Sequence, residues 1–283
     1  MYIFYAILYA LLIGFHEVFK KQAREKSNPS TVLVMFNTVT FLLGLLLIPF
    51  GVAIPLKFIP IFALKGFLLS VSWFFILKVI KDADISLVTS LRLVSVFLTF
   101  VLGITIFKES VGVLQIVGIV IVLIGITLIT MLNKKEKGQI RPLYVILILA
   151  SAIITTASEV IDKYTTTYLT NFQVQFWFLF FTFIFSWLFF GFECFKSKQF
   201  LIKKEDLKNY WIYIVGIFLF VGDLMLFLSY KSPNSQMIII SILAKLKILV
   251  TIFVGIFVFK ESNILKKILL TLFILVGTIL IVI

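Results

Sequence analysis

Long apolar runs separated by short polar joints are the feature that most constrains the fold of this chain. Ten of these runs are long enough to cross about 30 Å of hydrocarbon as an α-helix. They cover residues 3–25, 31–50, 60–80, 86–107, 111–132, 143–168, 172–193, 210–230, 236–258 and 264–283. Since 61% of the residues are hydrophobic and only 14% are charged, the composition excludes a soluble domain. The sequence predicts an all-α integral membrane protein with ten transmembrane helices.

Charge and motifs exclude several other classes. The net charge of +13 does not indicate nucleic-acid binding, because most Lys and Arg lie in the joints, where a membrane protein meets anionic lipid. A single histidine, His16, and a single cysteine, Cys194, provide neither a histidine-rich metal site nor an internal disulfide. No phosphate-binding loop, H-E-x-x-H helix or G-x-S-x-G elbow occurs. We therefore expect no enzyme, no cofactor, no metal and no nucleic-acid partner.

The first run resembles a signal peptide in its hydrophobicity. It lacks a basic start and a small-x-small cleavage site. We expect this segment to be retained as the first membrane helix.

A repeat divides the chain into two halves. The tetrapeptide FKES occurs at 107–110 and again at 259–262, and the same shift of 152 aligns Gly103 with Gly255, Gly125 with Gly277, and Thr99 with Thr251. HEVFKK (16–21) likewise resembles SEVIDK (158–163) at a shift of 142. The predicted units are residues 1–132, a polar linker at 133–142, and residues 143–283. Since five helices per half is an odd number, the second half enters the membrane inverted, which is the architecture of many alternating-access transporters.

The corner sequence and the helix after it resemble a known family. FKES followed by the glycine-containing run VGVLQIVGIVIVLIGITLI is similar to the EamA-type members of the drug/metabolite transporter superfamily. The first helix, which ends in a lysine, is similar too. The resemblance covers both halves, and it implies ten helices around a central cavity lined by helices 1, 3, 4, 6, 8 and 9. It implies no particular substrate.

Ionisable residues lie inside the predicted spans, where a charge costs roughly 2.5–3.5 kcal/mol. The acids are Glu17, Glu159 and Asp223, and the bases are Arg92, Lys245 and Lys247. One interpretation is that they neutralise one another as structural ion pairs, with Glu17/Lys21 and Glu159/Lys163 as further pairs within a helix. The other is that some of them meet at mid-membrane and bind a charged substrate or a proton.

A polar stripe favours the second interpretation. The run 86–107 places Thr89, Arg92, Ser95 and Thr99 at helical spacing, and the matching positions of 236–258 are Ser241, Ala244, Lys247 and Thr251. Lys245 and Lys247 are about 200° apart around a continuous helix, so we expect one to reach Glu159 or Asp223 while the other faces the cavity. The predicted substrate-binding residues are Arg92, Lys247, Glu17, Glu159, Ser95 and Lys245. The predicted proton-coupling residues are Glu17, Glu159 and Asp223.

Three further features have two interpretations each. His16 is either a hydrogen-bonded bystander or a proton relay to Glu17. The 33 Phe, with Trp73 and Trp177, are either lipid-facing filler or a cation cage. Gly112, Gly118 and Gly125 either allow close helix packing or form the seam of a homodimer.

The function that these observations favour is a multi-pass secondary transporter of the cell membrane. Its predicted substrate is a small polar metabolite with a carboxylate, such as an amino acid, moved by alternating access with proton coupling. The alternatives are a lipophilic cation or drug, a sugar phosphate, or a non-transporting membrane protein such as a lipid-interacting scaffold or an intramembrane enzyme.

The distribution of Lys and Arg also predicts an orientation. The joints after the first, third, fifth, seventh and ninth runs hold most of these residues, and such residues mark the cytoplasmic side. Both termini are therefore predicted to lie outside the cytoplasm, opposite to the arrangement that the family resemblance implies.

Overall fold

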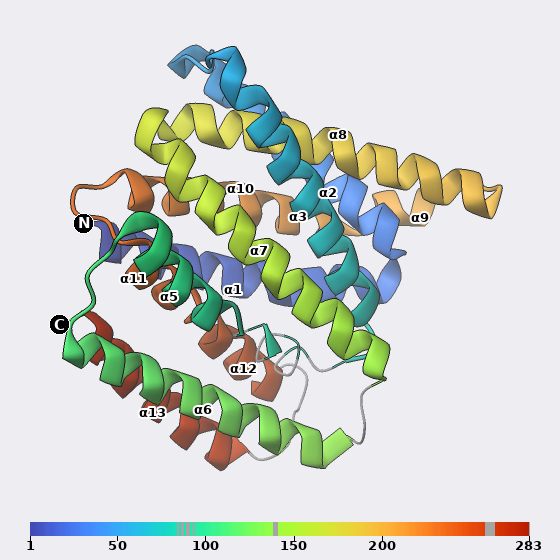
Figure 1. Ribbon diagram of the computed structural model, residues 1–283. Coiled ribbons are helices and arrows are strands. Elements are labelled where there is room, and N and C mark those ends of the chain that lie inside the picture. The colour runs from blue at the N-terminus through green and yellow to red at the C-terminus, as the bar shows by residue number, and fades with distance from the viewer. Residues whose placement is uncertain are drawn as a thin grey trace.

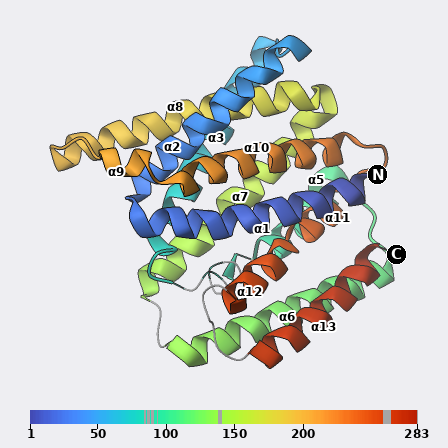
Figure 2. The same ribbon diagram turned by 180° about the vertical axis from the view of Figure 1, so that it is seen from behind.

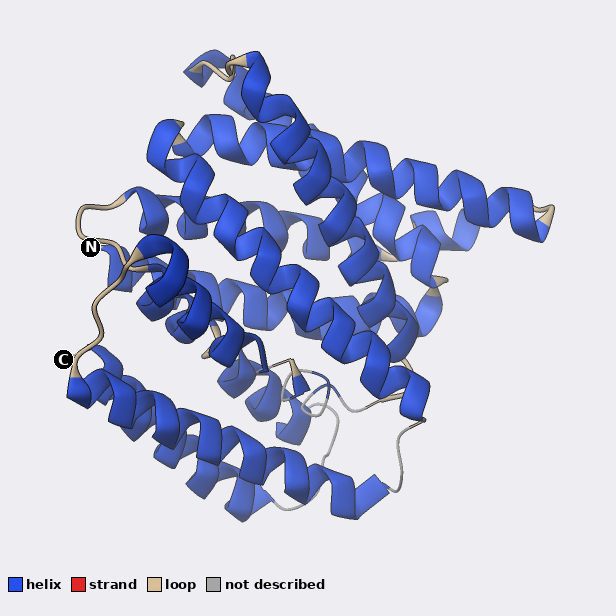
Figure 3. Ribbon diagram, viewed as in Figure 1, coloured by secondary structure: helices blue, strands red, loops and turns tan. Residues whose placement is uncertain are grey.

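The structure is a bundle of long helices (Figure 3). It is a computed structural model that describes residues 1–283 except 84, 86, 87, 89, 90, 93, 138–140, 258–263 and 283. Within these residues there is no strand. The helices are α1 (Tyr2–Lys26), α2 (Pro29–Gly44), η1 (Leu45–Phe50), η2 (Leu56–Phe58), α3 (Ile59–Val79), α5 (Val94–Phe107), α6 (Val113–Lys137), α7 (Pro142–Tyr168), α8 (Asn171–Ser197), α9 (Lys204–Leu207), α10 (Tyr210–Lys231), α11 (Met237–Ala244), α12 (Lys247–Phe257) and α13 (Ile264–Val282).

Several helices are long and apolar enough to cross a membrane. Six candidate spans are found among the described residues: Tyr2–Lys26, Pro29–Phe50, Leu56–Val79, Pro142–Tyr168, Asn171–Ser197 and Tyr210–Lys231. Shorter apolar helices cover Phe97–Phe107 and Val113–Gly125. The prediction of an all-helical membrane protein is confirmed at this level.

The helices pack in pairs drawn from both halves of the sequence. Helix α1 lies along α10, and α7 lies along α3 (Figures 1 and 2). Helix α2 packs on α8, while α6 and α13 form an outer pair at one edge of the bundle. Both termini lie at the same end of the molecule. The helices of the two halves are therefore interleaved, and the halves do not form separate bodies.

Local sequence explains where several helices begin and tighten. Pro29 occupies the first turn of α2, where its missing N–H leaves no bond unmade. At the start of α8, the Thr170 hydroxyl accepts a bond from the backbone N–H of Gln173, and the Gln173 side chain accepts one from the N–H of Thr170. Pro49 lies in the 3₁₀ segment that ends the first hairpin, because proline cannot donate an α-helical bond.

Three predicted segments differ from the structure in part of their secondary structure. The run 236–258 is not one continuous helix, since α11 ends at Ala244 and α12 begins at Lys247. Across this break the N–H groups of Lys245 and Ile248 donate to carbonyls three residues earlier, so the chain tightens into a 3₁₀ turn. The run 31–50 likewise changes from α to 3₁₀ after Gly44, and part of the linker 133–142 belongs to α6, which continues to Lys137.

Glycines allow close helix packing within the chain. A Cβ built on Gly125 would lie 2.6 Å from Cγ1 of Ile274 on α13, and one on Gly277 would lie 2.9 Å from the carbonyl oxygen of Gly118 on α6. Gly125 and Gly277 are matched positions in the sequence, and each of them allows the partner helix to approach closely. Gly118 and Gly125 therefore serve packing between α6 and α13, and the homodimer seam stays a prediction.

The aromatic side chains serve packing more than lipid contact on three helices. Phe36, Phe62 and Phe178 are buried between α2, α3 and α8. Phe41 of α2 stacks on Phe183 of α8 with ring centroids 4.6 Å apart. The interpretation of Phe as lipid-facing filler is wrong for these buried residues, whereas Phe67 of α3 and Phe192 and Phe195 of α8 are exposed.

Candidate functional site

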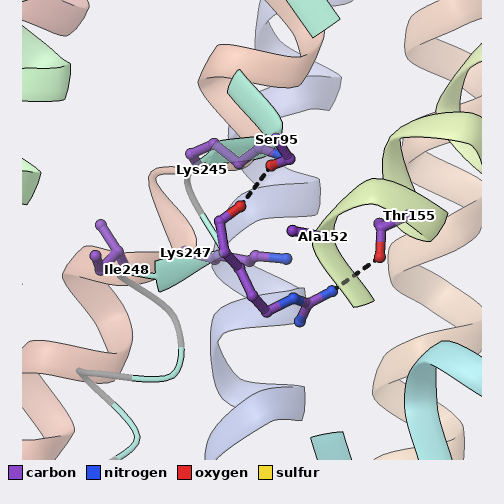
Figure 4. Close-up of a pocket in the computed structure, with 7 residues that line it drawn as sticks. Ser95, Ala152, Thr155, Lys245, Lys247 and Ile248 are labelled. Atoms are coloured by element: carbon purple, nitrogen blue, oxygen red, sulfur yellow. Dashed lines mark hydrogen bonds between the residues drawn. The ribbon is translucent and has the colours of Figure 1, made fainter. Parts of the chain in front are cut away.

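A central cavity of about 70 Å³ lies where helices of both halves meet. Its lining is mostly buried and unusually rich in charge for the interior of a helical bundle. The lining residues are Tyr9, Ile13, His16, Glu17, Lys65, Leu69, Trp73, Arg92, Thr155, Ser158, Glu159, Asp162, Phe178, Leu219, Asp223, Leu226, Phe227 and Lys247. A smaller cavity of about 20 Å³ adjoins it and is lined by Arg92, Ser95, Ala152, Thr155, Lys245, Lys247 and Ile248 (Figure 4).

Glu17 of α1 is neutralised by two cations. Its Oε2 lies 2.6 Å from Nζ of Lys20 on the same helix, and its Oε1 accepts a bond of 3.3 Å from Nη1 of Arg92. The predicted pairing partner was Lys21; the structure gives Glu17 the lysine one residue earlier. Glu17 thus joins the first helix to the segment that precedes α5.

Arg92 is held from several directions. Its Nη2 donates to Oγ1 of Thr155 on α7 at 3.2 Å, and its own carbonyl accepts from the hydroxyl of Ser95 at 2.7 Å (Figure 4). Arg92 borders both cavities. Of the predicted stripe, Ser95 and Thr99 are buried beside it, and Thr89 lies outside the described residues.

Glu159 of α7 is held by one cation and two hydroxyl groups. Lys245 donates to its Oε1 at 3.0 Å, while Ser241 and Thr99 donate to its Oε2 at 2.7 and 3.0 Å. Lys163, the predicted partner within the helix, instead donates to the carbonyl and hydroxyl oxygens of Ser235. The i,i+4 interpretation is therefore wrong for this pair.

A further buried ion pair joins α3 to α7 and was not predicted from the sequence. Lys65 of α3 donates to Oδ1 of Asp162 on α7, and its Nζ lies 3.9 Å from the ring centroid of Phe178 and 4.9 Å from that of Phe227. Lys65 is 1% exposed. Lys65 and Lys20 were not counted among the ionisable residues inside the predicted spans, yet both are buried. Asp162 was overlooked because it stands beside the more conspicuous E-x-x-x-K pattern.

Two titratable groups of the cavity, an amine and a carboxyl group, lack a partner among the described residues. Lys247 lines both cavities, and no hydrogen bond or ion pair joins it to any residue that the structure describes. In Figure 4 its amine points into the space between the helices. Asp223 of α10 is 6% exposed, and its Oδ2 is buried without a hydrogen-bond partner among the described residues. An ionised group left unpaired inside a protein is costly, so both groups are suited to meet a ligand.

His16 adds a further polar group to the cavity wall. It is 2% exposed, and neither ring nitrogen has a hydrogen-bond partner within the described part of the chain. The interpretation that a protein hydrogen bond explains this residue is therefore wrong. Its proton-relay role stays a prediction.

The cavity differs from a metal site. No group of three or more His, Cys, Asp or Glu side chains that could hold a metal ion was found within the residues described. The acids are instead interleaved with lysine and arginine, which repel a cation. The arrangement favours an organic ligand that carries its own charges.

The first FKES corner joins the two halves. Phe107 ends α5, Lys108 adopts a positive φ of 52°, and the Glu109 carboxylate accepts bonds from the backbone N–H groups of Met237 and Ile238 at the start of α11. A carboxylate at a helix N-terminus satisfies free donors and the helix dipole. The second copy, 259–262, lies outside the described residues.

Comparison with known proteins agrees with this architecture. Residues 1–131 match the model of the EamA-like transporter family, which confirms the resemblance to EamA-type proteins of the drug/metabolite transporter superfamily. No curated protein matches the chain. A solved structure described only as "Crystal structure of protein" has a TM-score of 0.71 and 14% sequence identity, and the match covers 99% of this chain and 94% of that one. At that identity the likeness concerns the fold alone, and it extends over both halves.

Proposed function

We propose that this EamA-like membrane protein is a secondary transporter that moves a small metabolite with a carboxylate, such as an amino acid, by alternating access. Its two halves are five-helix units of inverted topology, ten transmembrane helices in all. The cell membrane is its expected location. The chemistry required is selective binding at mid-membrane followed by release on the other side, without any covalent step.

The observation that carries this proposal is the pair of partner-free charges in the central cavity. Lys247 offers an ammonium group, and Asp223 offers a carboxylate oxygen. A zwitterion supplies a carboxylate to the first and an ammonium to the second. Charge-assisted hydrogen bonds of this kind are about twice as strong as neutral ones, and they form only when the right ligand enters.

Helix packing supports the inverted repeat. If α1 corresponds to α7 and α3 to α10, the contact of α1 with α10 is the counterpart of the contact of α7 with α3. The contact of α3 with α8 is likewise the counterpart of that of α10 with α2. Pseudo-symmetric pairing of this type lets one half take up the conformation of the other, which exchanges the side on which the cavity opens.

The ends of the bundle carry the contacts that alternate opening would break and remake. At the end where the termini lie, Lys163 of α7 donates to Ser235 and Glu109 accepts from the start of α11. At the opposite end, Arg24 donates to the carbonyl of Leu77 at 2.9 Å, and Asn209 donates to the carbonyl of Ala23 at 3.0 Å. These bonds would have to break and re-form when the cavity opens at one end and closes at the other.

The other predicted binding residues surround this pair. Arg92 has donors beyond its two bonds and borders both cavities, so it is a second candidate for the substrate carboxylate. Ser95 lies beside it. Lys245 is engaged by Glu159, so its contribution to substrate binding requires that this ion pair opens during the cycle.

Proton coupling through Glu17, Glu159 or Asp223 is proposed for the same cavity. A buried carboxyl group changes its proton affinity when an ion-pair partner leaves. Substrate binding that displaced Lys245 from Glu159, or Arg92 from Glu17, would therefore be linked to proton uptake. Transport that responds to a pH gradient in the wild type and not in Glu→Gln variants supports coupling, and wild-type flux independent of the gradient rejects it.

The orientation proposal rests on the joints. Lys20 and Lys65 are buried, so they are left out when the charges at the two ends of the bundle are compared. Lys26 at the end of α1, and Lys203 and Lys208 on either side of α9, are exposed at the end opposite the termini. That end is proposed to face the cytoplasm. A C-terminal reporter that works only in the cytoplasm should stay silent, and a strong signal would reverse the assignment.

Flux into liposomes tests the function itself. Purified protein is reconstituted and offered a radiolabelled panel of amino acids, other carboxylates, sugar phosphates and lipophilic cations. Saturable uptake of a carboxylate-bearing solute, inhibited by an excess of the same unlabelled solute, is the expected result. Selective uptake of cations or sugar phosphates would assign the site to another substrate class. Absence of saturable flux for every solute would favour a non-transporting protein.

A further inference from the structure

The buried environment of Lys65 has the chemistry of a binding site for an organic ammonium ion. Such sites combine aromatic faces with a carboxylate, because the negative face of the ring and the anion both attract a desolvated cation. Here the rings are Phe178 of α8 and Phe227 of α10, with centroids 3.9 and 4.9 Å from Nζ of Lys65. The carboxylate is that of Asp162 on α7.

The position of this site links it to the ligand cavity. Lys65, Asp162, Phe178 and Phe227 all line the central cavity, and Asp223 lies one helical turn from Phe227 on the same helix. Among the described residues Lys65 has one hydrogen-bond acceptor, Asp162, which leaves two of its three N–H donors available to the rings or the cavity. The ammonium therefore stands at the cavity wall rather than within a saturated polar network.

We propose that Lys65 is a built-in cation that fills an ammonium site of the cavity and so excludes simple organic cations. With Lys65 in place, the site for a substrate ammonium is reduced to Asp223, and a ligand must also bring a carboxylate for Lys247. A plain alkylammonium or quaternary ammonium ion satisfies only half of this arrangement. The lysine thereby selects zwitterions over cations.

This inference rests on the proposed function only in placing a ligand in the cavity. It is tested by binding, without measurement of transport. Absence of flux would therefore leave it standing, and a failed binding test would leave the proposed transport standing.

Removal of the lysine should open the site to an external amine. Lys65→Ala deletes a fragment equivalent to propylammonium and leaves the Asp162 carboxylate uncompensated between two rings. Thermal unfolding of the purified variant is followed with propylammonium chloride and with sodium chloride at equal ionic strength. The expected result is a rise in Tm of about 5 °C or more at saturating propylammonium, and none for the wild-type protein.

Matched variants separate the site from non-specific effects. Lys65→Met fills the volume without a charge and should not respond to the amine. Lys78→Ala removes an exposed lysine of the same helix that lies 4.3 Å from the ring of Phe74, and it should not respond either. The double variant Lys65→Ala/Asp162→Asn should lose the response, because the anion of the site is gone.

Each outcome decides the matter. A Lys65→Ala protein that gains no more from propylammonium than Lys65→Met, or a wild-type protein that gains as much, overturns the proposal. If Lys65→Ala cannot be purified in sodium chloride, it is produced with propylammonium present throughout. Folded protein obtained only in this way supports the site, and continued aggregation while Lys65→Met folds contradicts it.

Discussion

Helices α1 and α7 carry carboxylates at matching positions of the two halves, yet these carboxylates are neutralised differently. Glu17 faces two cations, Lys20 and Arg92. Glu159 faces one cation, Lys245, together with two hydroxyl groups. The charge pattern around these carboxylates is therefore not repeated, and the proposed repeat would concern helix packing rather than recognition.

The same contrast holds for the groups that lack a partner. Lys247 lies on α12 and Asp223 on α10, both in the second half. At the shift of the repeat, Lys247 corresponds to Ser95, which is neutral. A ligand held between Lys247 and Asp223 would therefore have one orientation, even though the proposed repeat would make the backbone of the cavity walls symmetric. A directional site within a symmetric scaffold suits a transporter that opens in turn to two sides.

The largest expected effect is a loss of stability when each of the two carboxylates is replaced by an amide. Glu17→Gln leaves two buried cations uncompensated and should lower the free energy of unfolding by about 3–5 kcal/mol. Glu159→Gln should cost less, because only one cation loses its partner. Chemical denaturation of the purified variants measures both. Glu17→Gln/Lys20→Met, which removes one of the excess cations, should recover part of the loss; equal losses for the two single variants would contradict the comparison.

The next largest effect distinguishes the roles of Lys245 and Lys247, which are two residues apart in the sequence. Lys247→Met should weaken substrate binding by roughly 10- to 150-fold, the value of a charge-assisted hydrogen bond of about 1.5–3 kcal/mol, while the free energy of unfolding should not fall, because the variant removes an ammonium group that has no partner among the described residues. Lys245→Met should instead destabilise the fold, because Glu159 loses its cation. Substrate titration and thermal unfolding of both variants test this. A Lys247 variant that is as unstable as the Lys245 variant would remove the distinction.

Glycines on α3 and α10, the proposed counterpart helices, test the symmetry of helix packing. A Cβ on Gly66 would lie 2.6 Å from Cβ of Phe181 on α8, and one on Gly216 would lie 2.7 Å from Cγ1 of Val39 on α2. Gly66→Ala and Gly216→Ala should each cost about 1–3 kcal/mol in unfolding free energy. Gly191 has nothing within 4 Å of its added Cβ, so Gly191→Ala is the control and should be neutral or slightly stabilising. Widely different costs at Gly66 and Gly216 would argue against equivalent packing.

The smallest expected effect concerns the two FKES corners. Glu109→Gln weakens the cap of α11 and should cost about 1 kcal/mol. The repeat predicts that Glu261, which lies outside the described residues, caps the start of the predicted run 86–107, so Glu261→Gln should cost about the same. Thermal unfolding of the two variants makes the comparison. A loss at one corner and none at the other would mean that the repeated sequence serves different ends.

The sequence indicated membrane-spanning helices because these depend on apolar patterns that extend over many residues, while the inverted repeat stays a prediction. It did not identify the burial of Lys20 and Lys65, since a lysine near a predicted helix end resembles one that reaches the surface. The partners Arg92 and Asp162 lie 75 and 97 residues away from Glu17 and Lys65. Such pairs depend on helix packing, which composition does not reveal.

The break between α11 and α12 was equally invisible to the sequence. Lys245 and Leu246 stand between strongly apolar segments without glycine or proline, the usual sign of a helix interruption. The prediction that Lys245 and Lys247 point different ways did not depend on the break, because residues two apart diverge on a regular helix as well. The sequence could not show which of the two lysines pairs with a carboxylate, because that depends on where Glu159 lies in the folded structure.

Alternating exposure of the central cavity is the claim on which the account depends most. Ser158 lines the cavity and is 2% exposed, and the chain contains one native cysteine, Cys194. Ser158→Cys in a Cys194→Ser background provides a single thiol at the site, which is probed in liposomes with a membrane-impermeant thiol reagent added from either side. The account predicts labelling from both sides of the membrane and protection by a transported solute. Labelling from one side only, or from neither, would contradict it.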